Sequence, residues 1–206
     1  IKENRMAEAK QLIEELLAFT PDDVALRREL VELCRREGKL PEYISQCTQL
    51  INAYQRRNEL DEAVELYRDL LQYEPDNVTF RTQLIDALLR LKRRNEAIEQ
   101  YFELAERYAR AENHEDAEHT LIELLNHSPG NPRALEMLID TLIRSDQSEQ
   151  AAQRAHELSE TYLSLGKTDK AVEVLQRILA FDPENVDVQN WLREIAYKRG
   201  MPRETV

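Results

Sequence analysis

The sequence predicts an all-α protein made of repeated helices. Prolines recur every 54 residues, at Pro21, Pro75, Pro129 and Pro183. Alanines keep the same interval, at Ala9, Ala63, Ala117 and Ala171. Apolar residues follow each alanine four and seven positions later, as Leu121 and Leu124 follow Ala117, and this spacing marks one face of a helix. Chance does not produce such copies, so internal repetition is the firmest inference from the sequence.

Apolar periodicity, interrupted at turn-forming residues, divides the chain into about eleven predicted helices. They span roughly 5–20, 23–37, 41–57, 60–74, 77–92, 95–112, 114–128, 131–145, 148–165, 168–181 and 185–199. Helices that contain the repeated alanine stop at the repeated proline, which cannot continue a helix. Asp, Glu, Asn or Gly follows the proline and supplies the turn and the N-cap of the next helix. Each period therefore holds three helices.

The middle helix of each period is predicted to be buried on two sides. Helix 95–112 carries Ala97, Tyr101, Leu104 and Tyr108 among its apolar residues, and they cover more than one face. Burial between two neighbouring helices requires this distribution. At the positions of Tyr101, Leu104, Ala105 and Tyr108, the other two middle helices hold apolar or small residues: Cys47, Leu50, Ile51 and Tyr54, and Ala155, Leu158, Ser159 and Tyr162.

These residues resemble the tetratricopeptide repeat (TPR), a helix–turn–helix unit of 34 residues. In that family, a helix carrying a large residue, Leu, a small residue and Tyr packs antiparallel on a helix that carries Ala and closes on Pro. The resemblance covers nearly the whole chain and implies a right-handed TPR-like α-α superhelix, or solenoid, with a 54-residue three-helix period. The chain departs from a plain array because its steps alternate between 34 and 20 residues, as from Ala63 to Ala97 and then to Ala117. One helix therefore closes one repeat and opens the next.

We expect residues 1–206 to form a single TPR-like repeat domain. Its units are approximately 1–22 (partial), 23–76, 77–130, 131–184 and 185–206 (partial). The chain begins with Ile, so it is interpreted as an excised part of a longer protein from which a leader could be missing. If helices alternate between two layers, an odd number per period puts equivalent helices in opposite layers. Which helices line a concave face therefore stays open.

The acidic composition restricts the classes of partner. A formal net charge of −12 at pH 7 repels phosphate backbones and anionic lipid, so neither a nucleic acid nor a membrane surface is the expected partner. No stretch approaches eighteen consecutive apolar residues. Cys34 and Cys47 each lie in an apolar helical pattern and are predicted to be small buried hydrophobes in a reducing compartment, with the cytoplasm as the default location.

No motif indicates catalysis, a metal or a cofactor. The segment His114–His119 invites comparison with zinc-binding helices, but residues five apart diverge by about 140° around a helix and cannot share a metal. There is no Gly-rich phosphate loop and no Cys-x-x-Cys. Basic clusters at 35–36, 56–57, 92–94 and 198–199 are predicted to lie in the last turns of helices, where a cation offsets the helix dipole. Gly38, Gly130, Gly166 and Gly200 are expected at turns or helix ends.

One charge pattern is more specific. Several predicted helices carry an acid and, four residues later, a base. The candidate partner-binding residues are these pairs and one neutral variant: Glu32 and Arg36, Asn52 and Arg56, Asp86 and Arg90, Glu106 and Arg110, Asp140 and Arg144. Glu194 and Lys198 follow the same order. Surface pairs that stabilise single helices by about 0.2–0.5 kcal/mol each would account for the pattern without any ligand.

The TPR resemblance implies that some of these pairs face a ligand, because this part of the opening helix lines the groove in that family. Carboxylate-clamp members place Lys and Asn there, and only Asn52 matches. We therefore expect no clamp for acidic C-terminal peptides, but a groove for an extended or helical peptide of basic or mixed charge.

The resulting functional hypothesis is a protein–protein interaction scaffold that is not an enzyme. Its alternative is a structural spacer or self-association module without a ligand groove, and a homo-oligomer is possible. A helical-repeat RNA binder is disfavoured by the acidity.

Overall fold

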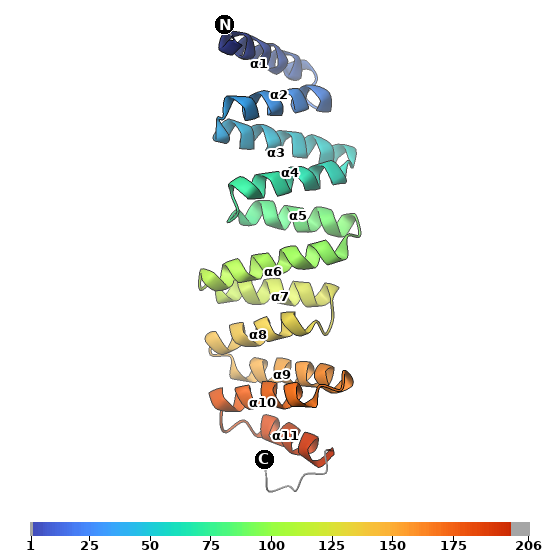
Figure 1. Ribbon diagram of the computed structural model, residues 1–206, viewed down its shortest axis with the longest axis vertical. Coiled ribbons are helices and arrows are strands. Elements are labelled where there is room, and N and C mark those ends of the chain that lie inside the picture. Colours follow the sequence, from blue (N-terminus) through green and yellow to red (C-terminus); the bar gives the residue numbers. More distant parts are fainter. Residues whose placement is uncertain (1, 199–206) are drawn as a thin grey trace. The chain divides into compact units, whose positions relative to one another are not determined.

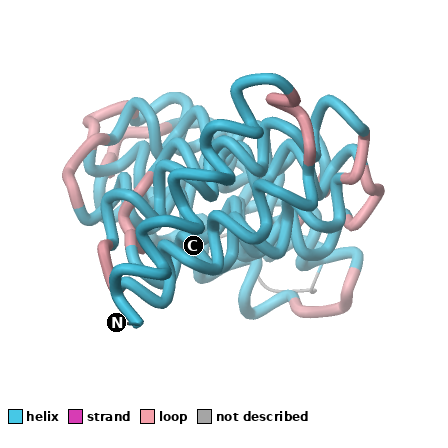
Figure 2. The backbone as a smooth tube through the Cα atoms, turned by 90° about the horizontal axis from the view of Figure 1, so that it is seen from above, coloured by secondary structure: helices cyan, strands magenta, loops and turns pink. Residues whose placement is uncertain are grey.

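The computed structural model describes residues 2–198, which form eleven α-helices and no strand (Figure 1). The predicted all-α class and the predicted helices are confirmed. By its contacts the chain divides into two compact units, Ile1–Ala97 and Ile98–Val206. Short loops join the helices (Figure 2).

The first unit contains five complete helices, and each packs on the next. They are α1 (Lys2–Phe19), α2 (Val24–Glu37), α3 (Leu40–Arg57), α4 (Leu60–Tyr73) and α5 (Val78–Arg90). Helix α6 (Arg94–Arg110) begins in the first unit and ends in the second. The second unit continues with α7 (His114–His127), α8 (Pro132–Arg144), α9 (Ser148–Ser164), α10 (Thr168–Phe181) and α11 (Val186–Lys198). From α7 onward each helix packs on the next.

The turn after each repeated proline starts the following helix as predicted. The side chains of Asp23, Asn77, Asn131 and Asn185, which are 54 residues apart, each accept a hydrogen bond from a backbone N–H three residues later. These bonds satisfy one of the N–H groups that a helix start leaves open. The same N-cap is therefore built in both units.

The other turns use a backbone conformation with positive φ. Gly38, Lys92 and Asp146 have φ of 71°, 60° and 59° and are 54 residues apart. Asn58, Glu112 and Gly166 form a second such series. Lys92 therefore lies beyond the end of α5 at Arg90, and the prediction that the basic cluster 92–94 closes a helix was wrong. Gly200 and residue 199 lie outside the described residues.

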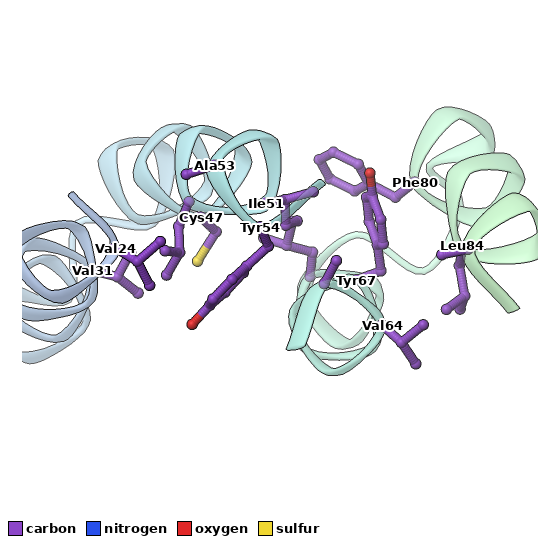
Figure 3. Packing of buried hydrophobic residues seen from close by; sticks show 14 of the residues in the cluster. Val24, Val31, Cys47, Ile51, Ala53, Tyr54, Val64, Tyr67, Phe80 and Leu84 are labelled. Carbon is purple, nitrogen blue, oxygen red and sulfur yellow. The ribbon is translucent and has the colours of Figure 1, made fainter. Parts of the chain in front are cut away.

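The core of the first unit contains aromatic and thiol side chains as well as aliphatic ones (Figure 3). Tyr67 of α4 lies beside Phe80 of α5, and Tyr54 of α3 belongs to the same buried cluster. The core cluster of the second unit is mainly Leu, Ile and Ala and includes Tyr162. The repeated Ala63, Ala117 and Ala171 are all fully buried. These alanines let neighbouring helices approach closely.

Candidate functional site

Two of the predicted acid–base pairs form within their own helices. Arg36 Nε lies 2.9 Å from a carboxylate oxygen of Glu32, and an Arg90 nitrogen lies 3.9 Å from Asp86. Arg90 also donates to Asn58 Oδ1 at 3.3 Å, across the turn between α3 and α4. All four charged side chains are between 46% and 66% exposed. Exposed pairs of this kind contribute less than about 1 kcal/mol to stability.

Arg56 lies at the other end of α2 from the Glu32–Arg36 pair. Its guanidinium pairs with Asp22, which lies two residues before the start of α2 at Val24. Arg36 lies in the last turn of α2, which has 14 residues. At about 1.5 Å per residue, the two arginines are separated by most of the length of that helix. The structure therefore does not bring these predicted residues together.

In the second unit, Glu106 pairs with a base from another helix rather than with Arg110. Arg133, on α8, donates to Glu106 Oε1 at 3.0 Å and lies 3.6 Å from Glu99. Its guanidinium carbon is 4.0 Å from the centre of the Phe102 ring, a cation–π contact. Arg110 donates instead to the backbone oxygen of Glu106. These contacts tie α8 to α6 within the unit.

Asp140 contacts a residue that lines a pocket between helices. Its carboxylate lies 3.4 Å from Arg177 of α10, again instead of its predicted partner Arg144. Arg177 is one of the residues that line a cavity of about 270 Å³, which we call the α8–α10 pocket: Glu136, Tyr162, Lys170, Glu173, Val174 and Arg177. All six belong to the second unit.

The α8–α10 pocket surrounds a phenol with both signs of charge. The Tyr162 hydroxyl donates to the Glu136 carboxylate, and Lys170 Nζ lies 5.6 Å from the centre of the Tyr162 ring. Burial, and then the Glu136 carboxylate, raises the pKa of Tyr162 to about 12. The hydroxyl therefore stays protonated at neutral pH and acts as a hydrogen-bond donor. Such a pocket can bind a segment of mixed charge.

Sequence reasoning identified Tyr162 as a repeat residue but missed the charged residues around it. Lys170 and Arg177 sit on the polar side of α10, where single-helix periodicity shows only solvent-facing residues. A comparison of the repeat copies could have singled out Arg177. The position of Arg177 is an acid in the two preceding copies, Asp69 and Glu123.

A smaller pocket lies in the first unit. It has a volume of about 130 Å³ and is lined by Cys34, Arg35, Gly38, Leu40, Tyr43 and Tyr73. The Tyr43 and Tyr73 rings meet edge to face with centroids 5.5 Å apart, and the Tyr43 hydroxyl donates to Asp69 at 2.6 Å. Cys34 and Cys47 are buried free thiols, as predicted. Burial raises the pKa of the Cys47 thiol to about 11, which makes it a poor nucleophile at neutral pH.

Within residues 5–198, whose side chains the structure describes, no three His, Cys, Asp or Glu side chains are grouped in a way that could hold a metal ion. His114 and His119 lie at the start and in the middle of α7. None of the described helices is long and apolar enough to cross a membrane.

Family models for the tetratricopeptide repeat match two segments, residues 54–111 and residues 152–185. The second segment covers most of the pair α9 and α10, in which Leu158 and Tyr162 of one helix and Ala171, Leu175 and Ile178 of the next belong to one buried cluster. The chain is a TPR-like repeat protein. Its TPR-like repeats support a general role in protein interaction, and this repeat fold is typically non-catalytic.

Solved structures with distant similarity carry related repeats. One contains the nearly identical TPR-like repeats of a putative kinesin light chain from Podospora anserina, with 15% identity, coverage of 95% of this chain and 96% of that chain, and a TM-score of 0.44. A MamA structure has 18% identity, coverage of 76% and 82%, and a TM-score of 0.36. BtubC from P. vanneervenii has 17% identity, coverage of 88% and 91%, and a TM-score of 0.35. These likenesses are too distant to identify a partner. No curated protein matches the sequence.

Proposed function

We propose that this TPR-like chain is a non-catalytic scaffold that binds a protein segment of mixed or basic charge in the α8–α10 pocket. The observation that supports the proposal is the arrangement of two acids and two bases around Tyr162 in one cavity. Free, buried Cys34 and Cys47 support a reducing intracellular compartment for this function.

The charges of the pocket give it a defined preference. Lys170 and Arg177 would attract a carboxylate of the bound segment, while Glu136 and Glu173 would attract a Lys or Arg beside it. Tyr162 lies between them with 4% of its surface exposed, and its hydroxyl holds the Glu136 carboxylate in place. Arg177 is about two-fifths exposed, so its charge is available to a ligand although it also contacts Asp140.

Capture from a native lysate at low and high salt tests this function, with the whole chain as bait. We expect a stoichiometric partner that is lost at high salt, because exposed charges are screened over about 8–10 Å at physiological ionic strength. The double variant Lys170→Glu and Arg177→Glu should lose that partner. Arg154→Glu is the matched control, since Arg154 is equally exposed but lies outside the pocket and pairs with Glu157. Equal capture by both variants would refute the proposed pocket.

The alternative function is a spacer or self-association module without a ligand groove. It is favoured by the internal pairing of the predicted site residues, since Arg36, Arg56, Arg90, Glu106 and Asp140 all contact charged groups of this chain. Light scattering on the bait separates the two functions. A monomer that captures a salt-sensitive partner supports the scaffold, whereas an oligomer that captures nothing supports the alternative.

A further inference from the structure

Helix α1 carries an apolar face that no described residue covers. Leu12, Leu16 and Phe19 are 58%, 44% and 86% exposed, and their spacing of four and three residues aligns them along one side of the helix. The opposite side is anchored. Leu17 is buried, and Lys10 pairs with Glu37 and Glu42 of the next two helices. The orientation of the exposed face is therefore fixed.

The internal repeats identify what normally covers this face. Leu16 has equivalents at 54-residue steps, Leu70, Leu124 and Ile178, and all three have no exposed surface. Leu70 lies on α4, which packs on α3 before it, and Ile178 lies on α10, which packs on α9 before it. Helix α1 has no counterpart of α3 or α9 among residues 2–198. A helix of that kind therefore fits against the exposed face of α1.

The last described helix differs from α1 in this respect. Residue 193 of α11 is an exposed Arg, whereas its equivalents in the earlier repeats are apolar and buried: Val31, Ile85 and Ile139. Arginine at that position makes this face of α11 more polar than the exposed face of α1. Helix α1 has no such substitution at its exposed face, because Leu12, Leu16 and Phe19 remain apolar.

We propose that the exposed face of α1 binds an amphipathic α-helix of a partner protein. The apolar side of that helix should resemble the shared pattern of α3 and α9, a Leu, then a small or aliphatic residue, then Tyr three residues later, as in Leu50, Ile51 and Tyr54. In this chain Leu50 and Leu158 are already buried, at 2% and 0% exposure. A second copy therefore has no free helix of this kind to offer.

The charges beside the face predict that the partner helix is basic near its Tyr. Helix α1 matches α10 closely, with Ala9, Leu17, Ala18 and Phe19 in place of Ala171, Leu179, Ala180 and Phe181. On α10, Lys170 and Arg177 lie around Tyr162 of α9. The equivalent residues of α1 are Glu8 and Glu15, so the charges are reversed. Acids at these two positions complement Lys or Arg on the partner.

Two synthetic peptides from this chain serve as models of the proposed partner helix. The α3 peptide, residues 40–57 with Cys47→Ala, has Arg56 and Arg57 two and three residues after Tyr54. The α9 peptide, residues 148–164, has Glu157 and Glu160 before Tyr162. We expect fluorescence anisotropy to show saturable binding of the labelled α3 peptide to the whole chain, and binding of the α9 peptide at least about tenfold weaker, equivalent to about 1.4 kcal/mol. Equal or tighter binding of the α9 peptide would overturn the basic preference.

The variant Leu16→Gln locates the bound peptide. Gln keeps helix propensity and removes the apolar contact, so the chain should keep its circular dichroism spectrum while α3-peptide binding falls at least about tenfold. Tyr197→Gln, at an exposed aromatic of α11, is the control and should leave binding unchanged. The proposal fails if Leu16→Gln binds as well as the unaltered chain, because the peptide would then sit elsewhere, for example in place of α3. It also fails if light scattering finds a dimer that Leu16→Gln dissociates, since a second copy would then occupy the face.

Discussion

The two units place different residues at the same positions of one repeat. Tyr43 of the first unit corresponds to Ala151 of the second, Cys47 to Ala155, and Tyr67 to Leu175. All of these residues are buried, with at most 3% exposure. The repeat therefore fixes which positions are buried, while each unit fills them with its own volumes and polar groups.

Polar groups in the first core need partners, and neighbouring residues supply them. The Tyr67 hydroxyl accepts a hydrogen bond from Gln55 at 3.1 Å and donates to Gln83 at 2.9 Å. In the second unit, Gln55 and Gln83 are replaced by Leu163 and Trp191. The residue in place of Tyr67 is the aliphatic Leu175, which has no hydroxyl. A buried hydroxyl without a partner costs about 1–3 kcal/mol, so these substitutions occur together.

Introducing the tyrosine of the first unit, Tyr67, at the equivalent position of the second unit should produce the largest loss of stability. Leu175→Tyr would overpack a site with no exposed surface and bury a hydroxyl between Leu163 and Trp191. We expect the free energy of unfolding to fall by about 2–5 kcal/mol. Urea titration followed by the fluorescence of Trp191, the only tryptophan, measures this loss in the second unit. Tyr67→Phe is the control: it removes only the hydroxyl and should cost about 0.5–1.5 kcal/mol. Similar losses for the two variants would contradict the inference that the buried tyrosine and its two hydrogen-bonding neighbours are replaced together in the second unit.

Alkaline pH should weaken the first unit before the second. Burial raises the pKa of Cys47 from 9.0 to about 11, so between these values the unfolded chain releases a proton that the folded chain keeps, and stability falls as pH rises. From this thiol alone we expect a loss of about 1.4 kcal/mol between pH 7 and pH 10.

Replacing the thiol by the residue of the second unit tests its contribution. Cys47→Ala should flatten the pH dependence of the urea midpoint, measured by circular dichroism with a reductant present. Burial also raises the pKa of Tyr67, to about 12, so a residual decline above pH 10 should remain. An unchanged decline between pH 7 and pH 10 in Cys47→Ala would exclude Cys47 as its source.

N-cap substitutions should affect the two units equally. Asn77 starts α5 and Asn131 starts α8, with side-chain bonds of 3.0 Å and 3.2 Å to the capped N–H. Because the cap does not depend on the core behind it, Asn77→Ala and Asn131→Ala should each cost about 1 kcal/mol. Thermal unfolding of the two variants measures this. A difference of more than about 1 kcal/mol between them would show that the cap and the core are coupled.

The sequence predicted the helices and caps because each depends on nearby residues. Pro21 and its three copies mark where helices stop, and Asp23 or Asn follows at a constant distance. The candidate site was less predictable, because Arg and Lys side chains are long enough to reach a neighbouring helix. Glu106 pairs with Arg133, and Asp140 with Arg177. These choices depend on which helices lie side by side, which the spacing within one helix does not reveal.

Turn conformation was predictable only where the residue was Gly. Gly38 has φ of 71° with no atom within 4 Å of an added Cβ, while its copies Lys92 and Asp146 adopt the same conformation. Side chains with a Cβ are disfavoured there, but Asp less than most, because its short polar side chain can bond locally. We therefore expect Lys92→Gly to stabilise the first unit by about 0.5–1 kcal/mol and Asp146→Gly to change the second by less. Urea midpoints of the two variants measure the difference, with Gly38→Ala as the reverse control that should lower stability by about 1 kcal/mol. A larger gain from Asp146→Gly than from Lys92→Gly would mean that the two turns differ in strain despite their equal φ.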